Sequence, residues 1–193
     1  PGDSIAIQMP NILQYPIAMY GSLRAGLRVV NTNPLYTERE MLHQFNDSGA
    51  KALICMDVFA KSVQNVKDQT GIKHIIVTSL ADMLPGLKRI VINAAAKHIK
   101  KMVPAYSLPE AVSFRKALKL GKGKAFQANH MKNPHDTIIL QYTGGTTGVA
   151  KGAELTNRNL VANMLQSASV LGQKTADGSG MKGDGQAVIV ATL

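Results

Sequence analysis

The amino-acid sequence predicts an α/β fold in which mostly parallel strands are covered by helices. Over residues 1–80, apolar strand-like runs alternate with segments of helical periodicity. The connections between these segments are short, which is typical of strand–helix–strand units that pair their strands in parallel. The composition, 45% hydrophobic and 18% charged over 193 residues, is that of a chain that can bury a core.

The first elements follow from the spacing of apolar residues. Residues 4–9, SIAIQM, are predicted as a short strand, and residues 11–25 as a helix closed by Gly26. One face of that helix carries four side chains, namely Ile12, Tyr15, Met19 and Leu23. An extended piece then begins at Val29 and ends at Pro34.

A capping box marks the start of the next helix. In 37-TERE-40, the Thr37 hydroxyl can accept from the amide three residues on, and Glu40 can reach back to the Thr37 amide. The predicted buried stripe of this helix is Met41, Leu42 and Phe45, and the run 47-DSG-49 ends it.

The alternation then continues along the chain. The pattern predicts a strand at 51–56, a helix from about 58 to 69 that stops at Gly71, and a strand at 72–78. Cys55 lies in the first of these strands and is predicted to be a small buried residue. Because it is the only cysteine, no intrachain disulfide can form, which fits a reducing cytoplasm.

Residues 81–135 interrupt the alternation with a basic amphipathic helix. Its apolar face comprises Leu87, Ile90, Val91, Ala94, Ala95, Ile99 and Met102, and its basic face comprises Lys88, Arg89, Lys97, Lys100 and Lys101. The pattern admits a surface helix packed on its own domain, a helix that docks on an anionic membrane, and a nucleic-acid-binding arm. Residues 104–135 are expected to form a loosely structured excursion, and 119-KLGKGK-124 a solvated loop.

The formal net charge of +10 predicts an anionic partner, which the charge alone does not identify. Nucleotide phosphates, nucleic acid and an anionic membrane surface all satisfy it. Aromatic residues make up 5% of the chain and Trp is absent, which disfavours a platform that stacks single-stranded bases. The histidines lack metal-site spacing and are interpreted as structural or solvated; they are His43, His74, His98, His130 and His135.

The stretch 142-YTGGTTGVAKG-152 is the strongest functional signal. A strand-like run, 137–142, leads into it, and a helix-like run is expected to follow. Its glycines permit positive φ and let a ligand approach backbone N–H groups closely. Threonine hydroxyls add donors, and Lys151 adds a mobile positive charge. This combination suits a polyphosphate better than a single carboxylate.

The spacing within this stretch excludes two common phosphate-binding motifs. A Walker loop has Lys directly after its second glycine, whereas two residues separate Gly148 from Lys151. A G-x-G-x-x-G fingerprint fails because Gly144 and Gly145 are adjacent. The residues alone therefore predict a phosphate-binding loop of an uncommon type, with a flexible Gly-rich hairpin as the alternative.

Residues 142–152 resemble the signature loop of the adenylate-forming superfamily, whose pattern is Y-T-S-G-T-T-G-x-P-K-G. That superfamily comprises acyl- and aryl-CoA ligases, luciferases and peptide-synthetase adenylation domains. Segments 1–11, 21–40 and 44–54 resemble, in order, those that open such enzymes, and 155-LTNRNL-160 resembles the helix start after the loop. Within the superfamily, the chain is most similar to bacterial long-chain fatty acid–CoA ligases.

Three positions depart from the pattern of most members. Gly144 replaces Ser, which removes one hydroxyl donor, and Ala150 replaces Pro, which leaves the turn before Lys151 less restricted. Asn157 stands where many members have His, so no role is transferred to that position.

The resemblance implies an ATP-dependent acid–thiol ligase, with part of the large N-terminal domain of such an enzyme as its fold. Such enzymes join a carboxylate to AMP with release of pyrophosphate, and CoA then displaces the AMP. The implied nucleotide-binding residues are Tyr142, Thr143, Gly144, Gly145, Thr146, Thr147, Gly148, Lys151 and Gly152. Lys151 and Thr146 are implied to be catalytic and Thr143 to be a Mg²⁺ ligand, whereas the aromatic ring of Tyr142 is expected to pack at the strand end.

We expect the 193 residues to be a fragment of the N-terminal AMP-binding domain, without the C-terminal domain and inactive alone. Its expected parts are alternating strands and helices at 1–80, the basic helical excursion at 81–135, and a strand, phosphate loop, helix and strand at 136–193.

The expected substrates and partners are a long-chain fatty acid, ATP, CoA and Mg²⁺, together with a peripheral contact with an anionic membrane and no nucleic acid. The expected location is the cytoplasm, including the inner face of the cytoplasmic membrane. Two alternatives remain: an adenylate-forming ligase for another acid, and a non-enzymatic basic module that binds membranes or nucleic acid.

Overall fold

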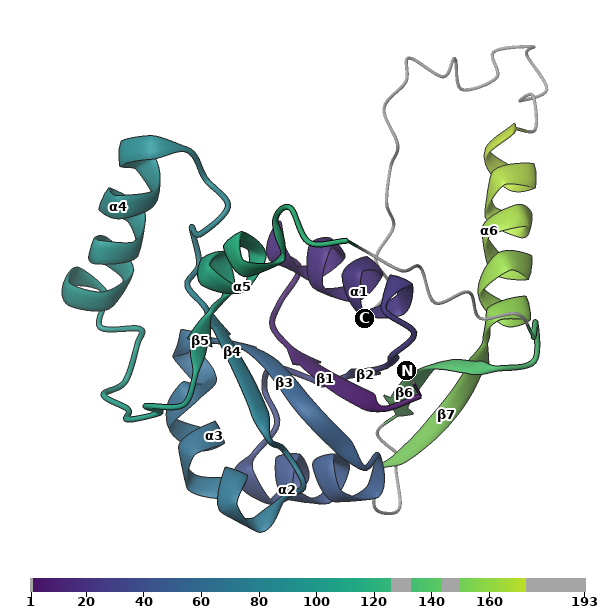
Figure 1. Ribbon diagram of the computed structural model, residues 1–193, viewed down its shortest axis with the longest axis horizontal. Helices are drawn as coiled ribbons and strands as arrows, with labels where there is room; N and C mark the ends of the chain where they lie inside the picture. Colours follow the sequence, from purple (N-terminus) through teal and green to yellow (C-terminus); the bar gives the residue numbers. More distant parts are fainter. Residues whose placement is uncertain (1, 126–132, 144–149, 173–193) are drawn as a thin grey trace.

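A computed structural model describes residues 2–125, 133–143 and 150–172, which form an α/β sandwich (Figure 1). The strands are β1 (Ser4–Gln8), β2 (Arg28–Asn31), β3 (Ala50–Met56), β4 (His74–Thr78), β5 (Val112–Ser113), β6 (Thr137–Thr143) and β7 (Lys151–Thr156). The α-helices are α1 (Gln14–Arg24), α2 (Glu38–Asp47), α3 (Ala60–Val66), α4 (Gly86–Ala94), α5 (Phe114–Gly121) and α6 (Asn157–Gly172).

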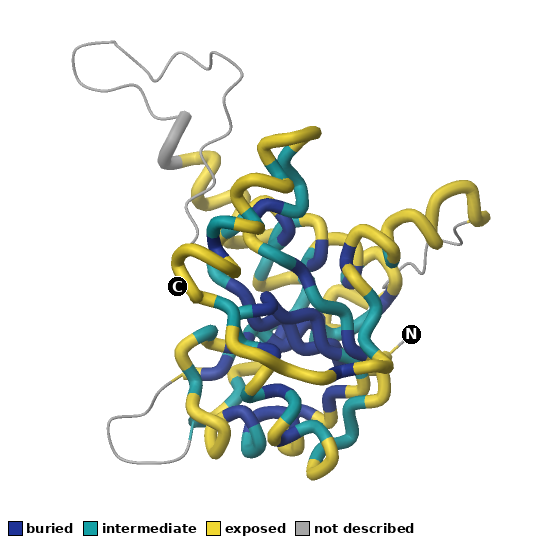
Figure 2. Tube along the Cα trace, turned by 90° about the vertical axis from the view of Figure 1, so that its left-hand side faces the viewer, coloured by how far each residue is buried: buried dark blue, intermediate teal, exposed yellow. Residues whose placement is uncertain are grey.

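The described strands form a seven-stranded sheet in the order β5-β4-β3-β1-β2-β6-β7. Every neighbouring pair is parallel except β6 with β7, which is antiparallel. This arrangement confirms the predicted α/β class with a mostly parallel sheet. Its central strands carry the most deeply buried part of the chain (Figure 2).

Helices cover both faces of the sheet. On one face, Met41 and Phe45 of α2 and Val63 of α3 pack in a core cluster with apolar residues of the central strands. On the other face, Ala18 of α1 and Phe114 of α5 belong to a second cluster. The sheet is therefore buried on both sides, as expected for parallel strands joined by helical crossovers.

The capping box predicted for α2 is present. The Thr37 hydroxyl accepts from the Glu40 amide at 3.4 Å, and the Glu40 carboxylate accepts from the Thr37 amide at 2.7 Å. The helix ends at Asp47, and Gly49 follows with a φ of +61°, a conformation that favours glycine. The predicted start and stop signals of this helix are both confirmed.

Three predictions about the elements differ in part from the structure. The segment predicted as a helix from about 58 to 69 is helical, but 3₁₀ turns at Asp57–Phe59 and Lys67–Gln69 flank the shorter α3. The excursion predicted at 104–135 contains β5 and α5, whose first turn is capped by Ser113 accepting from the Lys116 amide at 3.3 Å. The helix expected after the Gly-rich loop begins at Asn157, within 155-LTNRNL-160, but β7 precedes it, so the loop joins two antiparallel strands.

The basic amphipathic helix exists as α4, which continues into a π-helical turn at Ala95–Ile99. Its predicted apolar face lies largely in solvent, since Leu87 is 73% and Ile99 77% exposed. Figure 1 shows α4 apart from the helices that cover the sheet. Within the described part of the chain, no helix has the length and apolar character needed to cross a bilayer.

Polar contacts attach α4 to the end of β4. The Asn93 side chain accepts from the Ala81 amide at 2.8 Å and donates to Asp82 at 3.1 Å. Asp82 in turn accepts from the Thr78 hydroxyl and the Ser79 amide, at 3.1 and 2.9 Å. Ala96, in the turn after α4, is buried, whereas the larger apolar side chains on the outer side of the helix are exposed.

The capping box leads to a stability prediction. Thr37→Ala should lower the free energy of unfolding by about 1 kcal/mol at neutral pH, because the Glu40 amide loses its acceptor. Hydrogen bonds from Thr37 lower the pKa of Glu40. The carboxylate contribution is therefore complete above the ordinary pKa of Glu and is lost as pH falls through the lowered value. Urea unfolding at neutral and acidic pH measures both effects.

Thr37→Ser is the matched control, because serine keeps the hydroxyl and should unfold like the wild type. Equal losses in the alanine and serine variants would contradict a capping role for the hydroxyl.

Candidate functional site

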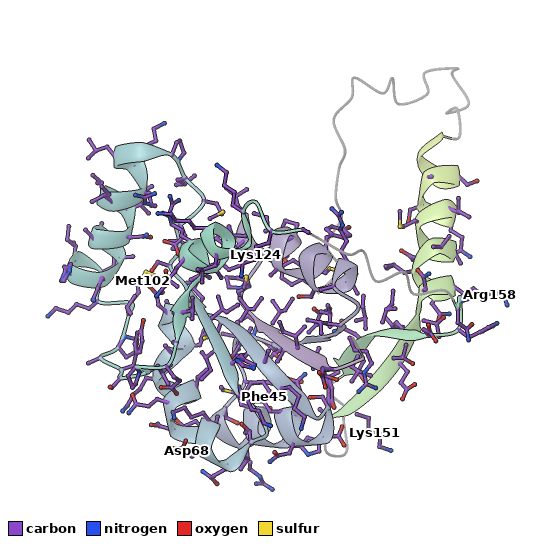
Figure 3. The ribbon with its side chains drawn as sticks, viewed as in Figure 1. Phe45, Asp68, Met102, Lys124, Lys151 and Arg158 are labelled. Carbon is purple, nitrogen blue, oxygen red and sulfur yellow. The ribbon has the colours of Figure 1, made fainter. Side chains whose placement is uncertain are left out.

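The β6–β7 hairpin places two predicted site residues opposite each other. In the antiparallel register, Thr143 pairs with Lys151 and Tyr142 with Gly152. Side chains of directly opposed residues start about 5 Å apart. Both Thr143 and Lys151 are exposed, so a hydroxyl and an ammonium group are available together at the end of the hairpin, where Figure 3 shows Lys151.

The residues between the two strands carry the rest of the predicted site. They lie outside the described part of the chain and are Gly144, Gly145, Thr146, Thr147 and Gly148. The assigned roles of these residues, including the catalytic role of Thr146, stay predictions.

The site lies at the edge of the sheet where ligands bind in open α/β folds. Strands β1, β2 and β6 run parallel, so their carboxyl ends meet at one edge, beside Thr143. Side chains reinforce this edge: Tyr15 donates to Asn31 at 2.9 Å, and Asn31 donates to Gln141 at 2.9 Å. The first helix is thereby linked through β2 to the strand that carries the loop.

Tyr142 is a core residue at the end of β6, as its predicted packing role requires. It is 7% exposed, and its hydroxyl donates a short hydrogen bond to Asp47 of α2. Burial raises the pKa of Tyr142 well above its ordinary value, and the hydrogen bond and negative charge of Asp47 raise it further. The hydroxyl therefore stays protonated and acts as a donor to α2.

Gly152 allows Tyr142 to pack against the hairpin. A Cβ at this position would lie 3.0 Å from two carbon atoms of the Tyr142 ring, closer than side-chain atoms normally approach. The glycine after Lys151 is therefore required by close packing against β6.

One residue near the site was missed by sequence reasoning. His43, interpreted as structural or solvated, lies on α2, and its Nε2 atom is 3.0 Å from the Ala150 carbonyl oxygen. Since a carbonyl oxygen only accepts, the imidazole is the donor. The contact joins residues 107 positions apart in the sequence, and no local pattern signals it.

The described residues provide few metal ligands. They contain no group of three or more His, Cys, Asp or Glu side chains that could hold a metal ion. Mg²⁺ usually keeps several waters and binds through substrate phosphates with few protein ligands. The hydroxyl oxygen of Thr143, exposed and opposite Lys151, fits that limited role.

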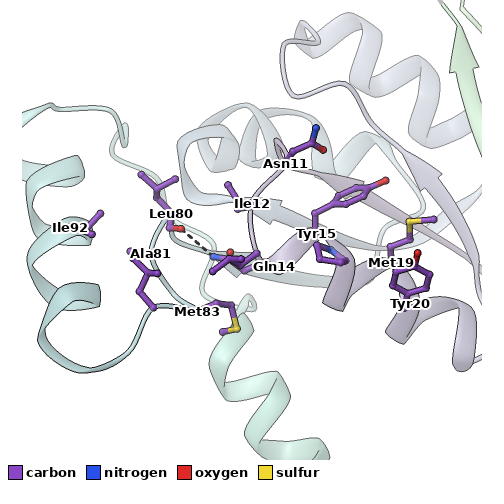
Figure 4. A pocket seen from close by; sticks show the side chains of 13 residues that line it. Asn11, Ile12, Gln14, Tyr15, Met19, Tyr20, Leu80, Ala81, Met83 and Ile92 are labelled. Carbon is purple, nitrogen blue, oxygen red and sulfur yellow. Dashed lines mark hydrogen bonds between the residues drawn. The ribbon is translucent and has the colours of Figure 1, made fainter. Parts of the chain in front are cut away.

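A separate apolar pocket of about 630 Å³ lies between the start of α1, the turn after β4, and α4 (Figure 4). Tyr15, Met83 and Ile92 are among its lining residues. Gln14 also lines the pocket, and its side-chain amide donates to the Ser79 carbonyl at 2.8 Å and to the Thr78 hydroxyl at 3.2 Å. The wall of the pocket is largely apolar.

The loop sequence, the placement of Thr143 and Lys151 at the carboxyl edge of a parallel sheet, and the exposure of Lys151 all suit a nucleotide phosphate. The family model of AMP-binding enzymes matches residues 1–193. The chain belongs to the AMP-binding enzyme family. This membership confirms the resemblance on which the site residues were assigned.

Curated relatives in this family are highly similar to the chain. It is 52% identical over 165 residues to a long-chain-fatty-acid–CoA ligase of Escherichia coli O6:H1, which covers 86% of this chain and 29% of the relative. It is 36% identical over 162 residues to a long-chain-fatty-acid–CoA ligase of Bacillus subtilis, with 84% and 29% covered. The chain thus spans less than a third of the length of these relatives.

Solved structures agree in fold. A long-chain-fatty-acid-CoA ligase from Archaeoglobus fulgidus superposes with a TM-score of 0.64 at 26% identity, over 90% of this chain and 29% of that one. An acetoacetyl-CoA synthetase from Streptomyces lividans superposes with a TM-score of 0.66 at 15% identity, over 88% and 24%. The second likeness supports the α/β fold alone.

The contact of Gly152 with Tyr142 can be tested by adding one methyl group. Gly152→Ala should lower the free energy of unfolding by about 1 to 3 kcal/mol, because the Tyr142 ring must move. Gly121→Ala is the matched control, since a Cβ there meets nothing within 4 Å. Equal thermal stability of the two variants would contradict the close packing.

Proposed function

We propose that this chain is the nucleotide-binding part of an ATP-dependent long-chain fatty acid–CoA ligase. The complete enzyme forms acyl-AMP and pyrophosphate from a fatty acid and ATP, and then acyl-CoA from CoA. The observation that carries the proposal is the placement of Lys151 opposite Thr143 at the carboxyl edge of the sheet, in a chain that the family model of AMP-binding enzymes matches over residues 1–193. The 52% identity to a ligase of this specificity supports the fatty acid as substrate.

The chemical problem of the first step is electrostatic. A carboxylate must approach a polyanionic nucleotide, and pyrophosphate must leave with its charge stabilised. Lys151 supplies a positive charge to the β- and γ-phosphates, and the exposed Thr143 hydroxyl supplies a donor beside it. Because Thr143 and Lys151 lie opposite each other on paired strands, their backbones are positioned before the nucleotide binds, which lowers the cost of orientation.

Thr143 is the proposed contact for Mg²⁺. A hydroxyl is the kind of oxygen ligand that Mg²⁺ accepts, and most of its remaining ligands would be phosphate oxygens and water. When bound, the ion would supply further neutralisation of phosphate charge.

We also propose that α4 holds the protein peripherally on an anionic membrane at the cytoplasmic face. Leu87, Ile90 and Val91 are each more than half exposed on this helix. Four lysines on α4 and in the segment that follows it are also exposed, namely Lys88, Lys97, Lys100 and Lys101. Apolar side chains that enter the lipid boundary, flanked by lysines that attract anionic headgroups, are the features of an interfacial helix.

Nucleotide binding is tested with the 193-residue chain and Mg-ATP. A ligand at about 100 times its dissociation constant stabilises a protein by about 2.7 kcal/mol, which is visible as a higher melting temperature. Lys151→Ala should weaken binding about tenfold or more, because a charge-assisted contact with phosphate is lost. Lys61→Ala, an exposed lysine of α3, is the matched control. Unchanged affinity in Lys151→Ala would refute the phosphate role.

Membrane binding is tested by co-sedimentation with vesicles. The chain should bind vesicles that contain phosphatidylglycerol and be released by high salt. Leu87→Asp should weaken binding about tenfold, because burial of a leucine side chain is lost. Leu165→Asp, at a similarly exposed leucine of α6, is the control. Equal binding by Leu87→Asp and wild type would exclude α4 as the contact.

A further inference from the structure

Helix α2 contacts both arms of the hairpin that carries the candidate site. Asp47 accepts the hydrogen bond from Tyr142, which directly precedes Thr143 on β6. His43 donates to the carbonyl of Ala150, which directly precedes Lys151 on β7. Residues four apart lie on the same face of a helix. One face of α2 therefore holds the residue before each of the two candidate phosphate contacts.

The helix is itself firmly anchored. Met41 and Phe45 are fully buried in the core, and the capping box closes its first turn. Gln44, next to His43, donates to the Asn31 carbonyl of β2 at 3.0 Å. Because the helix is fixed to the neighbouring strand, its contacts with the hairpin position the hairpin relative to the sheet.

The two arms need this support to different extents. The β6 arm is paired with β2 and β7, and its Tyr142 is buried. The β7 arm is the last strand of the described sheet, with β6 as its one strand neighbour there, and Lys151 begins it. A hydrogen bond to the Ala150 carbonyl restrains the peptide plane from which Lys151 extends. Because Ala150 does not restrict φ as a proline at this position would, the hydrogen bond supplies a restraint that the side chain does not.

We propose that His43 is a positioning residue for phosphate binding, which acts by fixing the peptide bond between Ala150 and Lys151. This role rests on the proposed nucleotide-binding function. In this role the imidazole acts through the Ala150 carbonyl oxygen, with which it makes its hydrogen bond. The imidazole restrains the backbone that carries the Lys151 side chain toward the phosphates. Without the imidazole, this backbone has more conformational freedom, which nucleotide binding must then restrict.

The test compares Mg-ATP and Mg-tripolyphosphate affinities of variants of the 193-residue chain by calorimetry. His43→Ala should weaken both about fivefold, the equivalent of one net hydrogen bond. His43→Gln should recover much of the affinity, because its amide can donate to the same carbonyl. His74→Ala, an exposed histidine of β4, should bind like the wild type.

A double-mutant cycle separates positioning from general destabilisation. If His43 acts through Lys151, His43→Ala should have little further effect on affinity in a Lys151→Ala background. Additive losses in the double variant, or equal affinity of His43→Ala and His74→Ala, would overturn the positioning role while the proposed function stands. If the wild type binds neither probe, the proposed function and the positioning role both fail.

Discussion

The pairing of β6 is the constraint on which the candidate site depends. β6 is parallel to β2 on one side and antiparallel to β7 on the other. The parallel pairing brings the end of β6 to the edge where β1 and β2 also end, and the antiparallel pairing returns the chain from that edge. As a result, β6 ends and β7 begins at the ligand-binding edge of an α/β sheet.

What could be predicted from the sequence was mainly local. The capping box at Thr37 and the glycine stop after α2 involve residues close in the chain, so the local sequence is sufficient to predict them. The order of residues from Thr143 to Lys151 was equally readable as a family signature. In contrast, β7 has the weak pattern KGAELT and depends on its pairing with β6. The contact of His43 with Ala150 spans 107 positions, so only the fold brings it about.

The burial of apolar residues differs between the centre of the sheet and the helix α4 near its β4–β5 end. Around β1 and β3, side chains are buried on both faces: Ala6 and Leu53 belong to one core cluster, and Ile7 belongs to the other. Near the β4–β5 end, α4 is attached by the polar contacts of Asn93, while its larger apolar residues are exposed. Exposed clusters of large apolar residues carry a hydration cost unless a partner covers them. The surrounding lysines favour a negatively charged partner, which is why a lipid surface satisfies both features of the helix.

The hairpin combines rigid arms with a glycine-rich connection, and the two have separate physical causes. Rigidity comes from Tyr142, whose ring packs against Gly152 and whose hydroxyl, kept protonated by burial and by Asp47, donates to α2. On the other arm, Ala150 does not restrict φ, and the hydrogen bond from His43 supplies a restraint through its carbonyl instead. A phosphate site gains from such support, because the backbone that carries Thr143 and Lys151 is held before a ligand binds. Helix α2 thus contacts the residue that precedes Thr143 and the residue that precedes Lys151, a link between distant segments that the loop sequence alone does not indicate.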